Sequence, residues 1–334
     1  MSSSDAPTTT VTVRSAADLA CVVPYFIGFH PAEGSVVVIA FAHARIVFAA
    51  RADLPKAGAP AAEAHRLGEH LTPVVRQQQA VTDAVLIGYG EAGHVDPALR
   101  VMQQAFTAAE VPIRDLLRVT GTRVFTITCP NPACCPPQGT PFDPAASPVA
   151  AQATVAGLVA FPDRNAVAAR FAPVDGAARE NIHAATQRAV TRLRSLLDAG
   201  HTVICETGVR AVENALRQHD AGQRLTDDQV AWLTALLTRT SVRDLAVELT
   251  QPHEGHVTFW ADVTRRAQRS LAAAPATLLA LTAWRCGNGG LAAMAADHAL
   301  EVNPGYQLAG LLLQALDAGL PPSTFEQAPT GEAH

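Results

Sequence analysis

Three cysteines in a proline-rich segment are the residues of this sequence best suited to metal or redox chemistry. Cys129, Cys134 and Cys135 occur as C-x4-C-C, whereas typical zinc sites use paired C-x2-C knuckles. Adjacent side chains of an extended chain project in opposite directions, so we expect at most one of Cys134 and Cys135 to aim with Cys129 at a shared ion. The pattern therefore favours reduced thiols packed in an ordered loop, with no cofactor. A zinc ion and a redox-active thiol pair are the alternatives.

A second group of polar residues lies at the predicted edge of a β-hairpin. His30 and Glu33 precede a strand predicted over Ser35–Phe41, and Arg51 and Asp53 end the strand that follows it. The two ends of a hairpin meet at one edge, so these side chains could converge for acid/base chemistry or anion capture. The plainer interpretation is that Asp53 pairs with Arg51 or caps a loop amide.

A third candidate follows another predicted strand, Ala84–Tyr89. Its last residues run into Gly88-Tyr89-Gly90-Glu91, at the end of a strand where open α/β sheets usually place ligands. As a phosphate signal this Gly-x-Gly is weak, since we expect neither a third glycine nor a helix N-terminus to follow at the required distance. The predicted candidate pocket consists of His30, Glu33, Arg51, Asp53, Tyr89 and Glu91.

Two histidines further along resemble a metal motif without matching it. His253-Glu-Gly-His256 places its histidines three residues apart and before a helix, unlike the H-E-x-x-H of zinc proteases. We interpret this segment as a solvated helix start, with a metal site as the alternative.

Alternating and β-branched runs in the first half predict a mixed sheet in the order ββαβαββ. We expect Pro24 to stop the first helix and Pro73 to end or kink the second. Pro130–Pro148 carries seven prolines in nineteen residues, so no regular structure is expected there. The predicted elements are helices over Ser15–Val23, Ala59–Gln79 and Pro97–Ala109, and strands over Ser35–Phe41, Arg45–Ala52, Ala84–Tyr89, Leu116–Thr120 and Thr122–Thr128.

The second half is predicted to be entirely helical, which makes the chain an α+β protein. The expected division is a disordered tail over 1–13, an α/β domain over 14–147, a helical domain over 148–322 and a disordered tail over 323–334. Gly287–Pro304 has the small-residue spacing of the second helix of a tetratricopeptide repeat, and we interpret it as part of one helical hairpin. The predicted helices are Val149–Val159, Arg164–Phe171, Gly176–Ala199, Thr207–Gln218, Asp227–Arg239, His256–Ser270, Pro275–Trp284, Gly290–Glu301 and Gly305–Ala318.

Composition and charge narrow the function classes. The 334 residues are 49% hydrophobic, which excludes a disordered chain, and the aromatic share of 5% predicts alanine-rich helical cores. The net charge of −5 divides almost evenly between the halves, 10 basic against 12 acidic residues over 1–145 and 15 against 18 in the remainder. Neither half carries the positive charge that nucleic acid binding needs. Without an apolar leader or a bilayer-length segment, we expect a cytoplasmic protein that binds neither nucleic acid nor membrane.

Several segments of the sequence together are distinctive. They are Pro24-Tyr-Phe-Ile-Gly-Phe-His-Pro31 with Ser35-Val-Val-Val, Arg51-Ala-Asp-Leu-Pro55, Cys129 through Pro141, Val242-Arg-Asp-Leu245, and Ala283-Trp284 through Asn303-Pro-Gly-Tyr306 to Gly319-Leu-Pro-Pro322. With these segments the chain resembles an actinobacterial family, the domain of unknown function DUF4192. The resemblance runs from about Arg14 to Pro322 and implies one two-part architecture, without implying an activity, a cofactor or a catalytic residue.

Two functions from different classes remain. A non-catalytic module that binds a protein or a small-molecule ligand is favoured, because no complete catalytic motif is present. An enzyme, hydrolytic or metal-assisted, is the alternative, with a pocket at the strand ends or between the domains. It would need His30, Asp53 and Tyr89 to share one cleft.

Overall fold

The structure is a computed structural model that describes residues 11–78, 80–198 and 200–326. The chain forms two compact units: the first runs to Arg164 and also contains Asp317–Thr324, and the second contains Asn165–Leu316. A mixed sheet in the first unit and helices in the second confirm the predicted α+β class. Residues 1–10 and 327–334 of the two predicted tails lie outside the described residues, and Ser323–Glu326 form a short helix, α14.

The sheet of the first unit has the strand order β2-β1-β3-β4-β5-β6. β1 pairs antiparallel with β2 and β3, β3 pairs parallel with β4, and β5 is antiparallel to both of its neighbours. The parallel pair requires a crossover, which α3 supplies. The strands are β1 Ser35–Ala42, β2 Arg45–Asp53, β3 Asp83–Tyr89, β4 Ile113–Thr120, β5 Arg123–Thr126 and β6 Thr140–Pro141.

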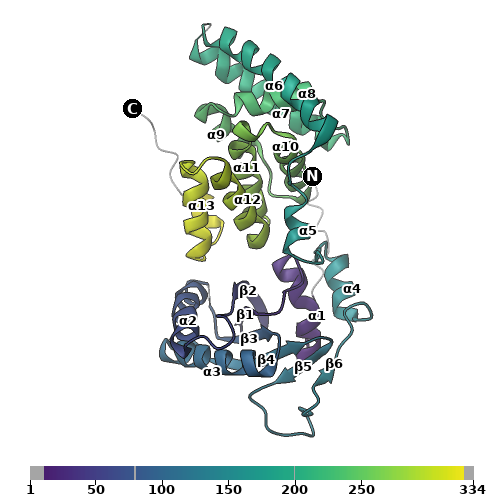
Figure 1. The fold of residues 1–334 in the computed structure, drawn as a ribbon, viewed down its shortest axis with the longest axis vertical. Coiled ribbons are helices and arrows are strands. Elements are labelled where there is room, and N and C mark those ends of the chain that lie inside the picture. Colours follow the sequence, from purple (N-terminus) through teal and green to yellow (C-terminus); the bar gives the residue numbers. More distant parts are fainter. Residues whose placement is uncertain (1–10, 79, 199, 327–334) are drawn as a thin grey trace, which may run out of the picture. The chain divides into compact units, whose positions relative to one another are not determined.

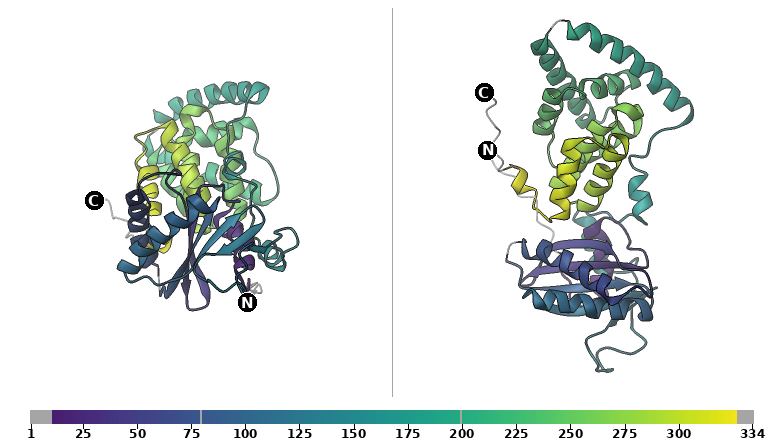
Figure 2. Two further views of the ribbon diagram at one scale, coloured as in Figure 1. Left: turned by 60° about the horizontal axis from the view of Figure 1, so that its bottom comes forward. Right: turned by 60° about the vertical axis from the view of Figure 1, so that its left-hand side comes forward.

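Two helices, α2 (Ala61–Arg76) and α3 (Ala92–Ala108), lie together over one face of this sheet (Figures 1 and 2). The strand residues at alternate positions, such as Val36 and Val38 of β1 and Leu86 of β3, form the floor of the core. The helices contribute buried side chains that include Leu71, Val75, Leu99, Met102 and Phe106. Central strands buried on both faces explain why β1 and β3 are near-continuous apolar runs.

Prolines lie inside three helices of this unit, which corrects the predicted helix ends. α1 (Ala16–Ile27) continues through Pro24 to Gly28, which has a φ of 87°. α2 continues through Pro73, and α3 begins at Ala92, five residues before the predicted start at Pro97. Each helix buries apolar side chains beyond its proline, and this packing outweighs the hydrogen bond that the proline removes.

The proline-rich segment contains one short regular element. β6 pairs with β5 through Arg123↔Pro141 and Val124↔Thr140, so the prediction of no regular structure is wrong at these two residues. Proline is tolerated because β6 is the edge strand, where the missing N–H breaks no ladder bond. Arg123 fixes the approach by donating to the carbonyls of Gln138 and Gly139, both at 3.0 Å. α4 (Pro148–Val155) then begins at the N-cap Ser147.

The second unit is helical throughout its described residues. A capping box of Thr226 and Gln229 begins α8 (Asp227–Leu236). α9 (Thr240–Leu249) is missing from the prediction, because its first turn, Thr240-Ser241-Val242, has low helix propensity. The elements from Arg164 onward are α5 Arg164–Ala168, α6 Gly176–Leu197, α7 His201–Asp220, α8 Asp227–Leu236, α9, α10 Glu254–Arg266, a 3-10 turn at Arg269–Leu271, α11 Ala273–Arg285, α12 Gly289–Val302 and α13 Gln307–Asp317.

α11 and α12 form the helical hairpin that the small-residue spacing predicted. Ala292 and Ala299, two residues of that spacing, are fully buried, and α12 ends at Val302, just before Pro304. The hairpin is held by close helix approach through alanines, since large anchor side chains are few in this chain.

The packing of α9 on α7 depends on one glycine, and this yields a stability prediction. A Cβ at Gly208 would lie 2.4 Å from Val242 Cγ2, so Gly208→Ala should destabilise the second unit by about 1–3 kcal/mol. Gly310, inside α13, has nothing within 4 Å of its built Cβ. Gly310→Ala should therefore stabilise the same unit by about 0.5–1 kcal/mol.

Urea denaturation followed by tryptophan fluorescence checks both variants, because Trp232, Trp260 and Trp284 all lie in the second unit. Equal effects of the two substitutions would contradict the close approach of α7 and α9.

Candidate functional site

The predicted edge of the hairpin exists, and its charged groups pair with each other. Ser35 is in register with Asp53 on β2 and with Tyr89 on β3, so these strand ends meet. Arg51 Nη2 lies 2.6 Å from Asp53 Oδ1 and also donates to Ser35 Oγ at 2.7 Å. The guanidinium of Arg51 is thus already paired with groups of the sheet. This agrees with the plainer interpretation, in which Asp53 pairs with Arg51.

The other four candidates do not form one reactive cluster with this pair. The Tyr89 ring is buried and its hydroxyl has no hydrogen-bond partner among the described residues, while burial raises its pKa far above the usual range. Glu91 is the N-cap residue of α3, and no cap hydrogen bond from its side chain is formed. His30 and Glu33 are exposed, and partial burial lowers the pKa of His30.

The glycines at the end of β3 correct the sequence analysis in two respects. α3 begins at Ala92, two residues after Gly90, so a helix N-terminus does follow the Gly-x-Gly. A third glycine, Gly93, is also present and completes the pattern Gly-x-Gly-x-x-Gly. A Cβ at Gly88 would meet Val95 of α3 at 2.3 Å, and one at Gly90 would meet the backbone of Gly34 at 3.6 Å. The space over these glycines is therefore filled by the chain itself.

The cysteine segment differs most from its prediction. The Sγ atoms of Cys129, Cys134 and Cys135 all lie within 4.8 Å of one another, and Cys129 Sγ is 3.3 Å from Cys134 Sγ. The expected divergence of Cys134 and Cys135 is wrong because the chain turns there instead of running extended. The Cys135 N–H donates to the Asn131 carbonyl at 2.9 Å, and the Ala133 N–H donates to Asn131 Oδ1. These three residues can hold a metal ion.

Hydrogen bonding among the thiols separates their acidities. The backbone N–H of Asn131 and then the Cys134 thiol lower the pKa of Cys129. The hydrogen bond to Cys129 raises the pKa of Cys134. Cys129 is thus the more acidic of these two thiols.

A second cluster, Asp220, His253 and His256, lies in the second unit. The segment is a helix start with His253 and Glu254 exposed, as interpreted, but His256 is buried, which corrects the interpretation at this residue. Its Nδ1 accepts the Gln251 N–H at 2.8 Å, so the neutral ring carries its proton on Nε2, which lies 3.5 Å from Asp220 Oδ1. The Nε2 of His256 has no hydrogen-bond partner among the described residues. The sequence analysis missed Asp220 because it is distant in the chain.

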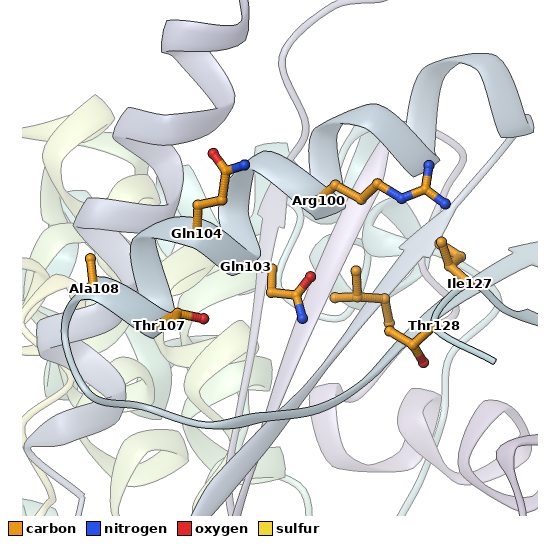
Figure 3. A pocket seen from close by; sticks show the side chains of 8 residues that line it. Arg100, Gln103, Gln104, Thr107, Ala108, Ile127 and Thr128 are labelled. Carbon is orange, nitrogen blue, oxygen red and sulfur yellow. The ribbon is translucent and has the colours of Figure 1, made fainter.

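A groove that the sequence analysis did not predict lies between α3 and the end of β5. Its volume is about 740 Å³, and its apolar floor includes Leu116 and Ile127. Figure 3 shows Arg100 and Gln103 extending from α3 toward the segment with Ile127 and Thr128. The eight lining residues are Arg100, Gln103, Gln104, Thr107, Ala108, Leu116, Ile127 and Thr128. None of the six predicted pocket residues is among them.

Comparison with protein families matches residues 17–323 to a domain of unknown function, DUF4192. The chain belongs to the DUF4192 family. No match was found among curated proteins or among solved structures. The DUF4192 match spans both compact units and includes the cysteine segment and the groove. Among the described residues of this DUF4192 protein, none of the helices has the length and apolar content needed to cross a bilayer.

The unpartnered hydroxyl of Tyr89 gives a prediction about the strand ends. Tyr89→Phe should raise the free energy of unfolding of the first unit by about 1 kcal/mol, since an unpaired buried hydroxyl costs about 1–3 kcal/mol. Tyr306→Phe is the control, because the Tyr306 hydroxyl bonds to Arg243 and its removal should destabilise the second unit. Urea denaturation with circular dichroism measures both, and a clear loss of stability in Tyr89→Phe would show that its hydroxyl has a partner.

The buried His256 predicts sensitivity to acid. Burial lowers its pKa below the usual value of 6.5, so the unfolded chain binds the proton more readily than the folded one. The contribution of neutral His256 to stability is complete above pH 6.5 and is lost as the pH falls through the pKa that His256 has in the folded protein. His256→Asn keeps an acceptor for the Gln251 N–H and cannot titrate.

The midpoint temperature of thermal unfolding should therefore fall less steeply between pH 7.5 and 5 for His256→Asn than for the parent protein. Equal slopes would mean that His256 does not titrate between the two states.

Proposed function

We propose that this protein is a non-catalytic binding module of the cytoplasm whose partner is a protein or small-molecule ligand. The groove between α3 and β5 is the proposed site. The single observation that carries the proposal is its lining: neutral amides, hydroxyls and apolar side chains, with Arg100 the one ionisable residue among the eight. Such a surface suits recognition, whereas acid/base chemistry needs titratable groups in the pocket.

The lining matches an extended peptide with a carboxylate group. Gln103 and Gln104 can each donate to and accept from peptide groups, and Leu116 and Ile127 offer an apolar floor. Arg100 can bind a carboxylate, because Asp96, one helical turn away, already has Arg118 at 3.6 Å. We therefore favour a peptide segment over nucleic acid or membrane as the partner.

The strand arrangement supports the same occupant. The register of β5 on β4 begins at Leu117↔Thr126, with the Ile127 N–H donating to the Leu116 carbonyl at 2.8 Å. Ile113–Asp115 of β4 therefore have no strand partner on that side among the described residues. Extended peptides add to a sheet where part of a strand's hydrogen-bonding edge is unpaired, and here such an edge lies beside the groove.

A panel of N-acetylated tripeptides, each with a free carboxylate or a C-terminal amide, tests the proposal. NMR shifts should appear at Gln103, Ile127 and Thr128, and the carboxylate forms should bind more tightly. Arg100→Ala should weaken the carboxylate peptides by about 10-fold or more, because a charge-assisted hydrogen bond contributes about 1.5–3 kcal/mol. Binding of the amide forms should change little.

The matched control is Arg66→Ala, which removes an exposed charge on α2. It should leave the binding of both carboxylate and amide peptides unchanged. Shifts confined to His30, Asp53 and Tyr89, or turnover of a peptide, would reject the groove and favour an enzyme.

A further inference from the structure

We propose that Cys129, Cys134 and Cys135 together bind one thiophilic d10 metal ion, Zn²⁺ or Cu⁺, through three thiolates. The proposal rests on the convergence of three sulfur atoms within 4.8 Å of one another. It is independent of the groove proposed above, because none of the three cysteines lines that groove.

A local turn of the backbone brings the three sulfur atoms together. Cys129 follows β5, and the turn at Asn131–Cys135 returns the chain so that Cys134 and Cys135 face it. The segment between β5 and β6 extends away from the sheet in Figure 1. A tetrahedral zinc with Zn–S bonds of about 2.3 Å needs sulfur separations of about 3.8 Å. The Cys129–Cys134 separation of 3.3 Å needs only a small opening to reach it.

Negative charge near the cluster favours a cation at this point, because Asp115 of β4 lies close enough to influence Cys129. Binding forms three metal–sulfur bonds, breaks the sulfur–hydrogen bond of each thiol that still carries a proton, and releases those protons to solvent. No oxidant or reductant takes part.

Exposure of the segment decides what completes the coordination. Cys134 is exposed and the other two are partly exposed, so water can reach the fourth position of a zinc ion. Three protein ligands with an open position are the arrangement that keeps zinc accessible to an exogenous ligand. Cu⁺ accepts three thiolates without a fourth ligand, so the same residues suit either ion.

A disulfide between Cys129 and Cys134 explains less of the geometry. It would use two sulfurs and leave the approach of Cys135 without a role. It also needs an external oxidant, and both thiols are free in the structure.

The test uses the full chain, reduced and stripped with a chelator, and then titrated with Zn²⁺ against a chromophoric competitor. One zinc per chain should bind, and Co²⁺ should give thiolate charge-transfer bands in the near ultraviolet. Cys129→Ser, Cys134→Ser and Cys135→Ser should each weaken binding by more than about 100-fold, since even outer-shell partners contribute 10–100-fold. Cys286→Ser, an exposed cysteine elsewhere, is the matched control and should bind normally. Circular dichroism confirms that each variant is folded.

A parallel titration with Cu⁺ against a Cu⁺-selective chelator distinguishes the two ions. Retention of Cu⁺ and not of Zn²⁺ would keep the site and assign copper to it. Alkylation with mass spectrometry provides a second measurement, in which the bound ion should protect these three cysteines of the six. Absence of uptake of both ions by the reduced protein would overturn the proposal. Uptake that persists in all three serine variants would overturn it too.

Discussion

The close approach of α3 to β3 at Gly88 is the constraint on which the first unit depends. No side chain fits between them, since a Cβ would meet Val95 at 2.3 Å. This contact lets α3 cross from β3 to β4 and makes that strand pair parallel. The same helix carries Arg100 and Gln103 to the groove, and Gly68 of α2 approaches it in turn, where a Cβ would meet Ala105 at 2.8 Å. Gly88, the first glycine of the Gly-x-Gly-x-x-Gly pattern, therefore has a packing role in this fold.

The second unit applies a similar principle with alanine. Its helices approach closely because the residues between them are small, and Ala276, Ala292 and Ala299 are fully buried. Two buried polar side chains of this unit hydrogen-bond to the backbone. Arg266 donates to the Leu225 carbonyl and pairs with Asp227 and Asp262, and His256 accepts a backbone N–H. Hydrogen bonds of this kind stabilise a single arrangement of the buried groups.

The two proposed sites share a strand but differ in chemistry. β5 leads through Ile127 and Thr128, which line the groove, into Cys129 of the thiol cluster. Thr128 donates to Asp115, whose charge also influences Cys129. A metal ion that fixed the segment after β5 would therefore act on residues directly continuous with one wall of the groove. The two sites remain separately testable, because no cysteine lines the groove and no groove residue is a metal ligand.

The sequence by itself determined the α+β class and the strand order of the hairpins. These features follow from local patterns, because alternation and β-branched runs act over a few positions. Tertiary structure decided that α1 and α2 continue through Pro24 and Pro73, that α9 is present, and in which direction Cys134 and Cys135 point. In each case a packed neighbour or a turn outweighed the local preference. The groove and the pairing of Asp220 with His256 also depended on tertiary structure, because both join residues that are far apart in the chain. Arg51 and Asp53 could be paired from sequence because a strand places residues two apart on one face, whereas no short-range rule brings α3 to Thr128.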